Sequence, residues 1–193
     1  STGGLDGSTV SMTSRSLAGE ASGNGDRGGY TQSGIWRRRL VELVILCGLQ
    51  ASGKSTFRRE RFPWHVVVSK DLLRNNRRRD RRQRQLVAEA LSAGQSVVVD
   101  NTNPAPEDRA ALVEIGRRLG ARVIGFYFET DFEVSVERNA ARSGRELVPL
   151  VGLVDVARRL RVPCAEEGFD EVWIVRTTSG EFELEPMFGD DRG

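Results

Sequence analysis

The nine residues GLQASGKST at positions 48–56 decide the fold of this chain. They have the form G-x-x-x-x-G-K-[ST] and follow directly after the apolar run LVILC at positions 43–47. A buried strand must deliver the chain to such a loop and a helix must leave it, because backbone N–H groups and the helix N-terminus then point at one anion. We therefore expect a strand over residues 41–47, a phosphate-binding loop, and a helix over residues 54–61.

Two residues of this loop have distinct expected roles. Lys54 would bridge the outer phosphates of a nucleoside triphosphate, and the Ser55 hydroxyl would hold Mg²⁺. The chain has 29 Lys and Arg residues, of which only Lys54 and Lys70 are lysines, so a compact ammonium is favoured at the loop position over a planar guanidinium. The alternative is a Gly-rich turn with an incidental lysine. The expected nucleotide-binding residues of the loop are Gly48, Gln50, Ala51, Ser52, Gly53, Lys54, Ser55 and Thr56.

Length and composition favour one globular domain. The 193 residues are 38% hydrophobic and 29% charged. We expect a disordered tail rich in Gly, Ser and Thr over residues 1–34, a catalytic domain over residues 35–188, and a flexible C-terminus over residues 189–193. The formal net charge of +2 is too small to demand an anionic polymer as partner.

The cysteines and the hydropathy pattern indicate where in the cell the protein is located. Cys47 and Cys164 have neither metal-site nor disulfide spacing, which favours a reducing, intracellular and cytoplasmic setting. No apolar stretch approaches the roughly twenty residues that cross a bilayer, and no signal-peptide pattern is present. We expect a soluble protein without a membrane partner.

Strand and helix patterns alternate from residue 35 onward, which predicts an α/β fold with a mainly parallel sheet of five strands and helices on both faces. Gly94 and Gly120 lie where helices should end, and Pro106 lies where one should begin. The expected strands are 41–47, 65–69, 96–99, 121–128 and 171–175, and the expected helices are 54–61, 72–93, 106–119, 132–142 and 150–160. Ligands of such sheets bind beyond the carboxyl ends of the strands.

Two acidic residues follow predicted strands. Asp100 comes directly after the third strand, where proteins with this loop hold the Mg²⁺ shell, here through water. Asp71 follows the second strand, and phosphoryl transfer to a hydroxyl needs a carboxylate within reach of the attacking O–H group. On local sequence alone, Asp100 could instead cap a turn and Asp71 could cap a helix.

A run of arginines lies on the helix expected after Asp71. Such a segment could hold a phosphodiester backbone through contacts that do not read sequence. Arg74 is one helical turn beyond Asp71 and would point toward the same cleft. The alternative is a solvated, charged helix surface. The run consists of Arg74, Arg77, Arg78, Arg79, Arg81, Arg82 and Arg84.

Together these residues resemble the P-loop 5′-polynucleotide kinase family, over nearly the whole chain after the tail. The resemblance rests on the phosphate loop and on an ordered set of further motifs. These are Val68-Ser69-Lys70-Asp71, Asp100-Asn101-Thr102-Asn103-Pro104 with Arg109, Arg138-Asn139 with Arg142, Val148-Pro149, and Pro163 followed by Glu167-Gly168-Phe169 and Glu171-Val172.

The resemblance implies ATP and Mg²⁺ as cofactors and Asp71 as the general base. It also implies that Arg142 is a lid arginine that stabilises the transferring phosphate, while Arg176 is a nucleotide-binding candidate by position only. Lys70 stands where these kinases usually have Arg, so charge is kept but the bidentate fork is lost. The expected substrate-binding residues are Lys70, Asp71, Arg74, Asp100, Thr102 and Arg109.

Arg138 would act from the same lid. Arg138 and Arg142 are one helical turn apart and share a face, so both could reach one phosphate. An arginine supplied in cis can neutralise charge on the equatorial oxygens in the transition state. The alternative is an ordinary solvated basic face.

We therefore expect an ATP-dependent polynucleotide 5′-hydroxyl kinase acting on DNA, RNA or both in end repair, as a monomer or weak dimer. No D-x-D-x-[TV] phosphatase motif is present, so kinase activity alone is expected. One alternative is a P-loop kinase of a small molecule such as a nucleoside, antibiotic or sugar nucleotide, since fold alone does not choose the acceptor. The other is a nucleotide-dependent binding protein, although no N-K-x-D base-reading motif is present.

Overall fold

The computed structural model of the protein describes residues 41–73, 75–178 and 180–188. The predicted tail (1–34), the predicted C-terminus (189–193) and Arg74 lie outside the described residues. In chain order the elements are β1 Glu42–Gly48, α1 Lys54–Arg61, β2 Val66–Val68, the 3₁₀ helix η1 Lys70–Leu73, α2 Arg79–Ser92, β3 Val97–Val99, α3 Pro106–Arg118, β4 Arg122–Phe128, α4 Phe132–Ala140, η2 Gly144–Glu146, α5 Leu150–Arg159, η3 Ala165–Glu167, β5 Glu171–Thr178 and β6 Glu181–Phe188.

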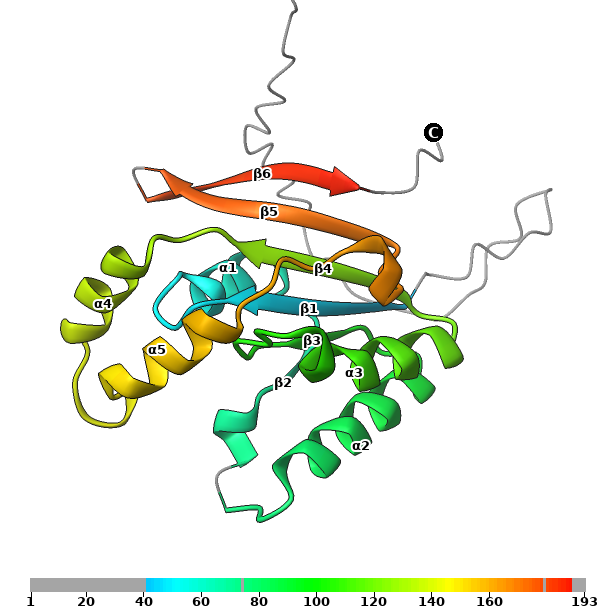
Figure 1. The fold of residues 1–193 in the computed structure, drawn as a ribbon. Helices are drawn as coiled ribbons and strands as arrows, with labels where there is room; N and C mark the ends of the chain where they lie inside the picture. Colours follow the sequence, from blue (N-terminus) through cyan, green and yellow to red (C-terminus); the bar gives the residue numbers. More distant parts are fainter. Residues whose placement is uncertain (1–40, 74, 179, 189–193) are drawn as a thin grey trace, which may run out of the picture. The chain divides into compact units, whose positions relative to one another are not determined.

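One sheet organises the domain, with the strand order β2-β3-β1-β4-β5-β6 (Figure 1). All neighbouring strands are parallel except β5 and β6, which form an antiparallel pair. The strand β1 is central, with Ile45 paired to Val99 on one side and to Gly125 on the other. This confirms the predicted α/β fold and its mainly parallel sheet. The prediction of five strands was short by one, because β6 adds an edge strand.

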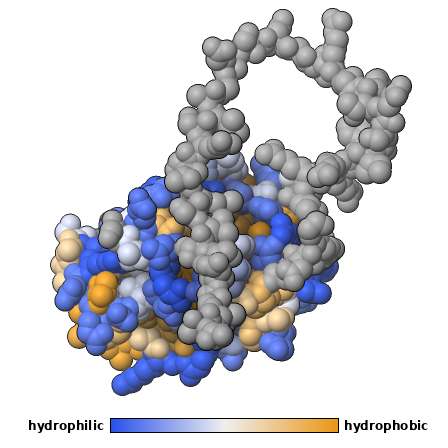
Figure 2. All heavy atoms as spheres, turned by 90° about the horizontal axis from the view of Figure 1, so that it is seen from above, coloured by the Kyte–Doolittle hydropathy of each residue, from blue (hydrophilic) through white to orange (hydrophobic). Residues whose placement is uncertain are grey.

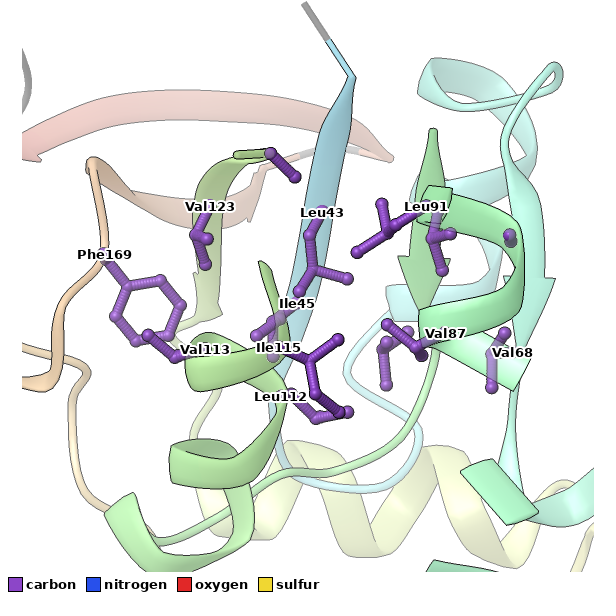
Figure 3. Close-up of a cluster of buried hydrophobic side chains, with 14 of the residues drawn as sticks. Leu43, Ile45, Val68, Val87, Leu91, Leu112, Val113, Ile115, Val123 and Phe169 are labelled. Atoms are coloured by element: carbon purple, nitrogen blue, oxygen red, sulfur yellow. The ribbon is translucent and has the colours of Figure 1, made fainter. Parts of the chain in front are cut away.

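One face of the sheet packs on α2 and α3. Leu43 and Ile45 of β1 point toward Leu112, and other side chains of α2 and α3 complete this cluster (Figure 3). Gly116 lets α3 approach closely, since a Cβ there would lie 2.7 Å from a methyl carbon of Val123. Burial of aliphatic side chains of this size stabilises by about 1.5–3 kcal/mol each.

The opposite face packs on α1. Val44 and Leu46 point to this side and join Phe57 of α1, which is 1% exposed. The Phe57 ring makes edge contacts with Phe128 and Phe182 at centroid separations of 5.3 and 5.1 Å. Because both faces are covered, β1 reads as a continuous apolar run instead of an alternating one.

The helix boundaries mostly agree with expectation. Residues 54–61 form a helix as predicted, and Gly94 and Gly120 follow α2 and α3 with φ of 74° and 69°. The single helix predicted over residues 72–93 is wrong. The chain forms η1, leaves helical geometry around residues 75–78, and begins α2 only at Arg79.

The described surface is mixed in character. On the face shown in Figure 2, hydrophilic residues surround separate hydrophobic patches. None of the helices in the described part of the chain has the length and hydrophobicity that a bilayer crossing requires.

Candidate active site

The phosphate loop joins β1 to α1 through backbone conformations that few residues adopt. Gly48 and Gly53 have φ of 149° and 95°, and Ala51 has φ of 59°. A Cβ on Gly48 would lie 2.9 Å from the Cβ of Phe128, so the loop leaves β1 against β4 with no room for a side chain. The loop therefore places the N-terminus of α1 at the carboxyl end of the sheet, where backbone N–H groups can receive an anion.

Lys54 is folded back into this loop. Its Nζ donates hydrogen bonds to the carbonyl oxygens of Gly48 (3.1 Å) and Leu49 and to the Ser52 hydroxyl (3.0 Å). Burial lowers the pKa of Lys54 to about 8, while the nearby Asp100 carboxylate opposes the shift and Arg142 adds to it. The charge of the Lys54 ammonium is therefore influenced by both the predicted magnesium acid and the predicted lid arginine.

Asp100 follows β3 and is held by hydrogen bonds of both its backbone and its side chain. Its N–H donates to the carbonyl of Val68 (3.0 Å), and its carboxylate accepts from Arg58 Nε (3.2 Å). The Ser55 hydroxyl lies at the exposed start of α1. In the described ranges, no group of three or more His, Cys, Asp or Glu could hold a metal ion. One hydroxyl and one carboxylate fit Mg²⁺, which takes its remaining ligands from nucleotide phosphates and water.

The Asp71 segment is fastened to the end of the neighbouring strand. Asn101 Oδ1 accepts hydrogen bonds from Lys70 N–H (2.8 Å) and from the Ser69 hydroxyl (3.4 Å). The Ser69 hydroxyl in turn accepts from Asp71 N–H (3.3 Å). Asp71 is exposed on η1, at the same edge of the sheet as Asp100. This arrangement places Asp71 near the carboxyl ends of the strands, where ligands of such sheets bind.

Lys70, a predicted substrate-binding residue, contacts another side chain. Its Nζ lies 2.6 Å from Asp80 Oδ1 in the first turn of α2, and this hydrogen bond lowers the pKa of Asp80. About a third of the Lys70 side chain is exposed, so an anion could compete with Asp80 for it.

The arginine run does not form one helical face. Arg77 and Arg78 lie in the turn before α2, while Arg74, which was expected to point toward the Asp71 cleft, lies outside the described residues. The turn frames a hollow of about 390 Å³ lined by Leu72, Leu73, Asn75, Asn76 and Arg77. Of the run, Arg77, Arg78, Arg79, Arg81 and Arg84 are exposed, and Arg82 is half-buried. The basic surface is therefore present, on a turn followed by a helix.

The lid region consists of α4, α5 and the loop between them. Arg138 is exposed on α4, while Arg142 is half-buried and lies two residues beyond the end of that helix. The predicted helix to Arg142 was therefore too long, although Arg142 N–H still donates to the Asn139 carbonyl (3.0 Å). The Asn139 side chain donates to the Val148 carbonyl (2.8 Å) and accepts from its N–H (3.1 Å), which closes the loop.

Contacts of Gln50 attach both lid helices to the phosphate loop. The Ser135 hydroxyl of α4 donates to the Gln50 carbonyl, and the Gln50 side-chain amide donates to the Gly152 carbonyl of α5 (3.5 Å). Ser135 is fully buried. Sequence reasoning missed Ser135 and Arg58, because each contacts its partner across a long stretch of chain.

Two predicted arginines differ in outcome. Arg109 was expected to bind substrate, and this is wrong: its side chain is fully buried and forms a two-bond ion pair with Glu167. The nucleotide-binding role of Arg176 stays a prediction; its half-exposed guanidinium contacts the carboxylates of Glu129 and Glu185. The strands β5 and β6 also border the loop, because a Cβ on Gly53 would lie 3.2 Å from the Phe182 ring.

Thr102 contributes its backbone to the site. Its carbonyl accepts a hydrogen bond from Gly48 N–H (2.9 Å), and its half-buried side chain lies on the loop after β3. The loops after β1 and β3 are thus bonded directly to each other.

An AAA domain family matches residues 43–163, more than half of the chain. The chain belongs to this family. The bifunctional polynucleotide phosphatase/kinase of Schizosaccharomyces pombe is 27% identical to the AAA domain protein over 136 residues, which are 68% of this chain and 32% of the relative. The chain therefore spans about a third of the length of that relative.

Solved structures resemble the AAA domain in fold. A gluconokinase from Sinorhizobium meliloti 1021 is 20% identical, with a TM-score of 0.51 over 72% of this chain and 83% of that chain. A crystal structure of AvrRxo1-ORF1:-ORF2 with ATP is 15% identical, with a TM-score of 0.59 over 76% of this chain and 61% of that chain. The AAA domain thus has a kinase-like P-loop fold.

Proposed function

We propose that this AAA domain transfers the γ-phosphate of ATP to the 5′-hydroxyl end of DNA, RNA or both, in end healing and repair. The observation that carries the proposal is the hydrogen bond from Lys70 N–H to Asn101 Oδ1, which fastens the Asp71 segment to the loop of Asp100. A carboxylate for a hydroxyl and a loop for phosphates then lie at the carboxyl ends of strands in one sheet.

The residues have complementary roles in this proposal. Asp71 accepts a hydrogen bond from the 5′-hydroxyl and takes its proton as the new O–P bond forms and the bond to the ADP oxygen breaks. Lys54 neutralises the outer phosphates, and Arg142 and Arg138 approach them from the lid. Mg²⁺, when bound by Ser55 and by Asp100 through water, neutralises charge on the phosphate oxygens.

The acceptor strand is proposed to lie on the exposed arginines after η1. Arg77, Arg78 and Arg79 can contact phosphates without reading sequence, so affinity for an oligonucleotide should fall as salt rises. The named kinase activity of the S. pombe relative supports this acceptor class. The gluconokinase is alike in fold only and therefore does not favour a sugar acceptor.

The extent of the domain and its assembly are also proposed. Residues 35–188 would form the catalytic domain, with the sheet from β1 to β6 as its described part. It would act as a monomer or weak dimer.

A transfer assay tests the proposal. The protein is incubated with γ-labelled ATP, Mg²⁺ and DNA or RNA oligonucleotides that carry either a 5′-hydroxyl or a 5′-phosphate. Label should enter only the hydroxyl ends. Label in neither strand, with transfer to gluconate or a nucleoside instead, would overturn the proposal in favour of a small-molecule kinase.

A pair of matched variants tests the proposed base. Asp71→Asn should lower transfer by about 10²- to 10⁴-fold, because it removes the proton acceptor, while leaving ATP binding intact. Asp155→Asn is the control, since Asp155 is an exposed carboxylate of α5. Full transfer activity of Asp71→Asn would remove this residue from the mechanism.

A further inference from the structure

The buried Arg109 lies at the centre of a hydrogen-bonded network between the nucleotide loop and the lid. Its guanidinium donates from Nε and Nη2 to the Glu167 carboxylate at 2.7 and 2.6 Å. Its Nη1 donates to the backbone carbonyls of Asn103 (3.0 Å), Pro104 (3.3 Å) and Arg161 (3.1 Å). The side chain is 0% exposed, so these contacts satisfy a cation that water does not reach.

The network reaches the phosphate loop through Asn103. Asn103 is 2% exposed and adopts φ of 41°, which is unusual for a residue other than glycine. In this conformation its Nδ2 donates to the carbonyl of Leu46 at 2.7 Å, two residues before the loop begins. Asn103 therefore links Arg109 to β1: its backbone carbonyl accepts a hydrogen bond from Arg109, and its side chain bonds the end of β1.

The same network reaches the lid through Arg161, just beyond α5. Arg161 N–H donates to the Pro104 carbonyl (2.8 Å), and the Arg161 carbonyl accepts from Arg109. The start of α5 is bonded to Gln50 of the phosphate loop. Both ends of α5 are thus connected to the nucleotide site, the start through Gln50 and the end through Pro104 and Arg109.

A fold alone does not need a charge here. A buried ion pair costs several kcal/mol of desolvation per ion, and apolar residues of similar volume often stabilise as well or better. What an apolar residue cannot do is bond the carbonyls of residues 103, 104 and 161 at once. The guanidinium meets this requirement because the two N–H groups of Nη1 are shared among the three carbonyls while Nε and Nη2 hold Glu167, whereas a lysine ammonium has three donors and no fork.

We infer that Arg109 is a positioning residue of the nucleotide site: through Asn103 it fixes the end of β1 that enters the phosphate loop, and through Arg161 it fixes the lid helix relative to that loop. The inference rests on the proposed function only in placing the triphosphate at this loop. It assigns Arg109 a role in ATP binding without any contact between Arg109 and ATP.

The test measures binding of a fluorescent non-hydrolysable ATP analogue with Mg²⁺, alongside thermal unfolding. Arg109→Lys should weaken analogue binding by about tenfold in protein that still unfolds cooperatively. Arg117→Lys is the matched control on the same helix, since Arg117 is exposed and bonds only the Gly168 carbonyl among the described contacts (2.9 Å). The control should bind the analogue as the wild type does.

A second variant keeps the inference testable if Arg109→Lys fails to fold. Asn103→Ala cuts the link to Leu46 and should itself weaken analogue binding by about tenfold. In the double variant the combined loss should be smaller than the product of the two, because both variants break the connection through Asn103, although Arg109 also acts through Arg161. Analogue affinity within twofold of wild type in folded Arg109→Lys or Asn103→Ala, or losses that multiply, would overturn the inference.

This readout separates the two proposals. Wild-type protein that binds the analogue without phosphorylating oligonucleotides would refute the proposed acceptor and leave the role of Arg109 measurable.

Discussion

Raising the pH from 7.5 to 9 should change how the chain binds ATP, because Lys54 loses its proton in this range. Burial holds the Lys54 pKa at about 8 in the folded protein, so about nine in ten of these side chains are neutral at pH 9. Bound phosphates place negative charge beside the amine and restore its proton. Binding should therefore take up about 0.9 proton at pH 9 and about 0.25 at pH 7.5.

The same pKa sets how strongly, and in which direction, pH changes the free energy of unfolding. Lys54 titrates near 8 when folded and 10.5 when unfolded, a gap of about 3 kcal/mol. Because the pKa of Lys54 is lower in the folded protein than in the unfolded chain, burial of the charged amine destabilises the folded protein by this full amount below pH 8. The cost disappears as the pH rises from 8 to 10.5, where the unfolded chain holds more protons. Over that range, affinity for ATP should fall as the pH rises, because binding must restore the proton that the free loop has lost.

Calorimetry measures the proton uptake directly. The non-hydrolysable ATP analogue is titrated at pH 9 in two buffers of different protonation enthalpy, and the difference in heat gives the protons taken up. Lys54→Met is the control, since it retains the loop but has no group to titrate. Uptake below about 0.2 proton at pH 9, with binding intact, would refute the placement of Lys54 against the phosphates.

Three further predictions concern separate parts of the domain. Arg58→Gln removes the partner of Asp100 and should lower the Mg²⁺ concentration needed for half-maximal analogue binding by severalfold; an unchanged Mg²⁺ titration would contradict competition between Arg58 and the cation. Arg142→Ala should lower kcat by about 10²- to 10³-fold with little change in analogue affinity, and a change in affinity alone would assign it to ground-state binding. Gly116→Ala should lower the free energy of unfolding in urea by about 1–3 kcal/mol, because the new methyl group would lie 2.7 Å from Val123; an unchanged midpoint would show that α3 can move away.

The elements around the phosphate loop could be predicted because the conformational preferences of the residues there and the packing of the whole sheet favour the same structure. The apolar run of β1 and the loop glycines allow only one arrangement, and α1 begins and ends as expected. The helix over residues 72–93 could not be predicted correctly. Its arginines favour a helix locally, whereas the hydrogen bond that Lys70 N–H donates to Asn101 Oδ1 holds the start of η1 against the loop after β3. That contact joins residues 31 positions apart and leaves no local signal.

The strand β6 was missed although its pattern was readable. Phe182, Leu184 and Phe188 alternate with exposed residues, which is typical of a half-buried strand. Pro186 lies within the run and argues against a central strand, but an edge strand tolerates it.

Arg109 shows why site residues are harder to predict than elements. Its place in a motif suggested contact with substrate. A motif, however, contains both side chains that touch a ligand and side chains that only hold the ligand-binding backbone in place, and the sequence does not tell the two apart. The deciding partner, Glu167, is 58 residues away. Lys54 directly follows a loop glycine, Asp100 directly follows β3, and Asp71 lies in the 3₁₀ helix after β2, so their positions near the carboxyl ends of the strands could be read from the sequence.

The order of the strands separates opposite charges across the domain. Exposed glutamates of β6 (Glu181, Glu183 and Glu185) line one flank, while the arginines before and within α2 lie beyond the other end of the sheet, beside β2. A polyanion that diffuses toward the protein is repelled by the first flank and attracted by the second, so it is turned before any contact forms. Such steering makes the encounter rate, and not only the equilibrium, sensitive to ionic strength.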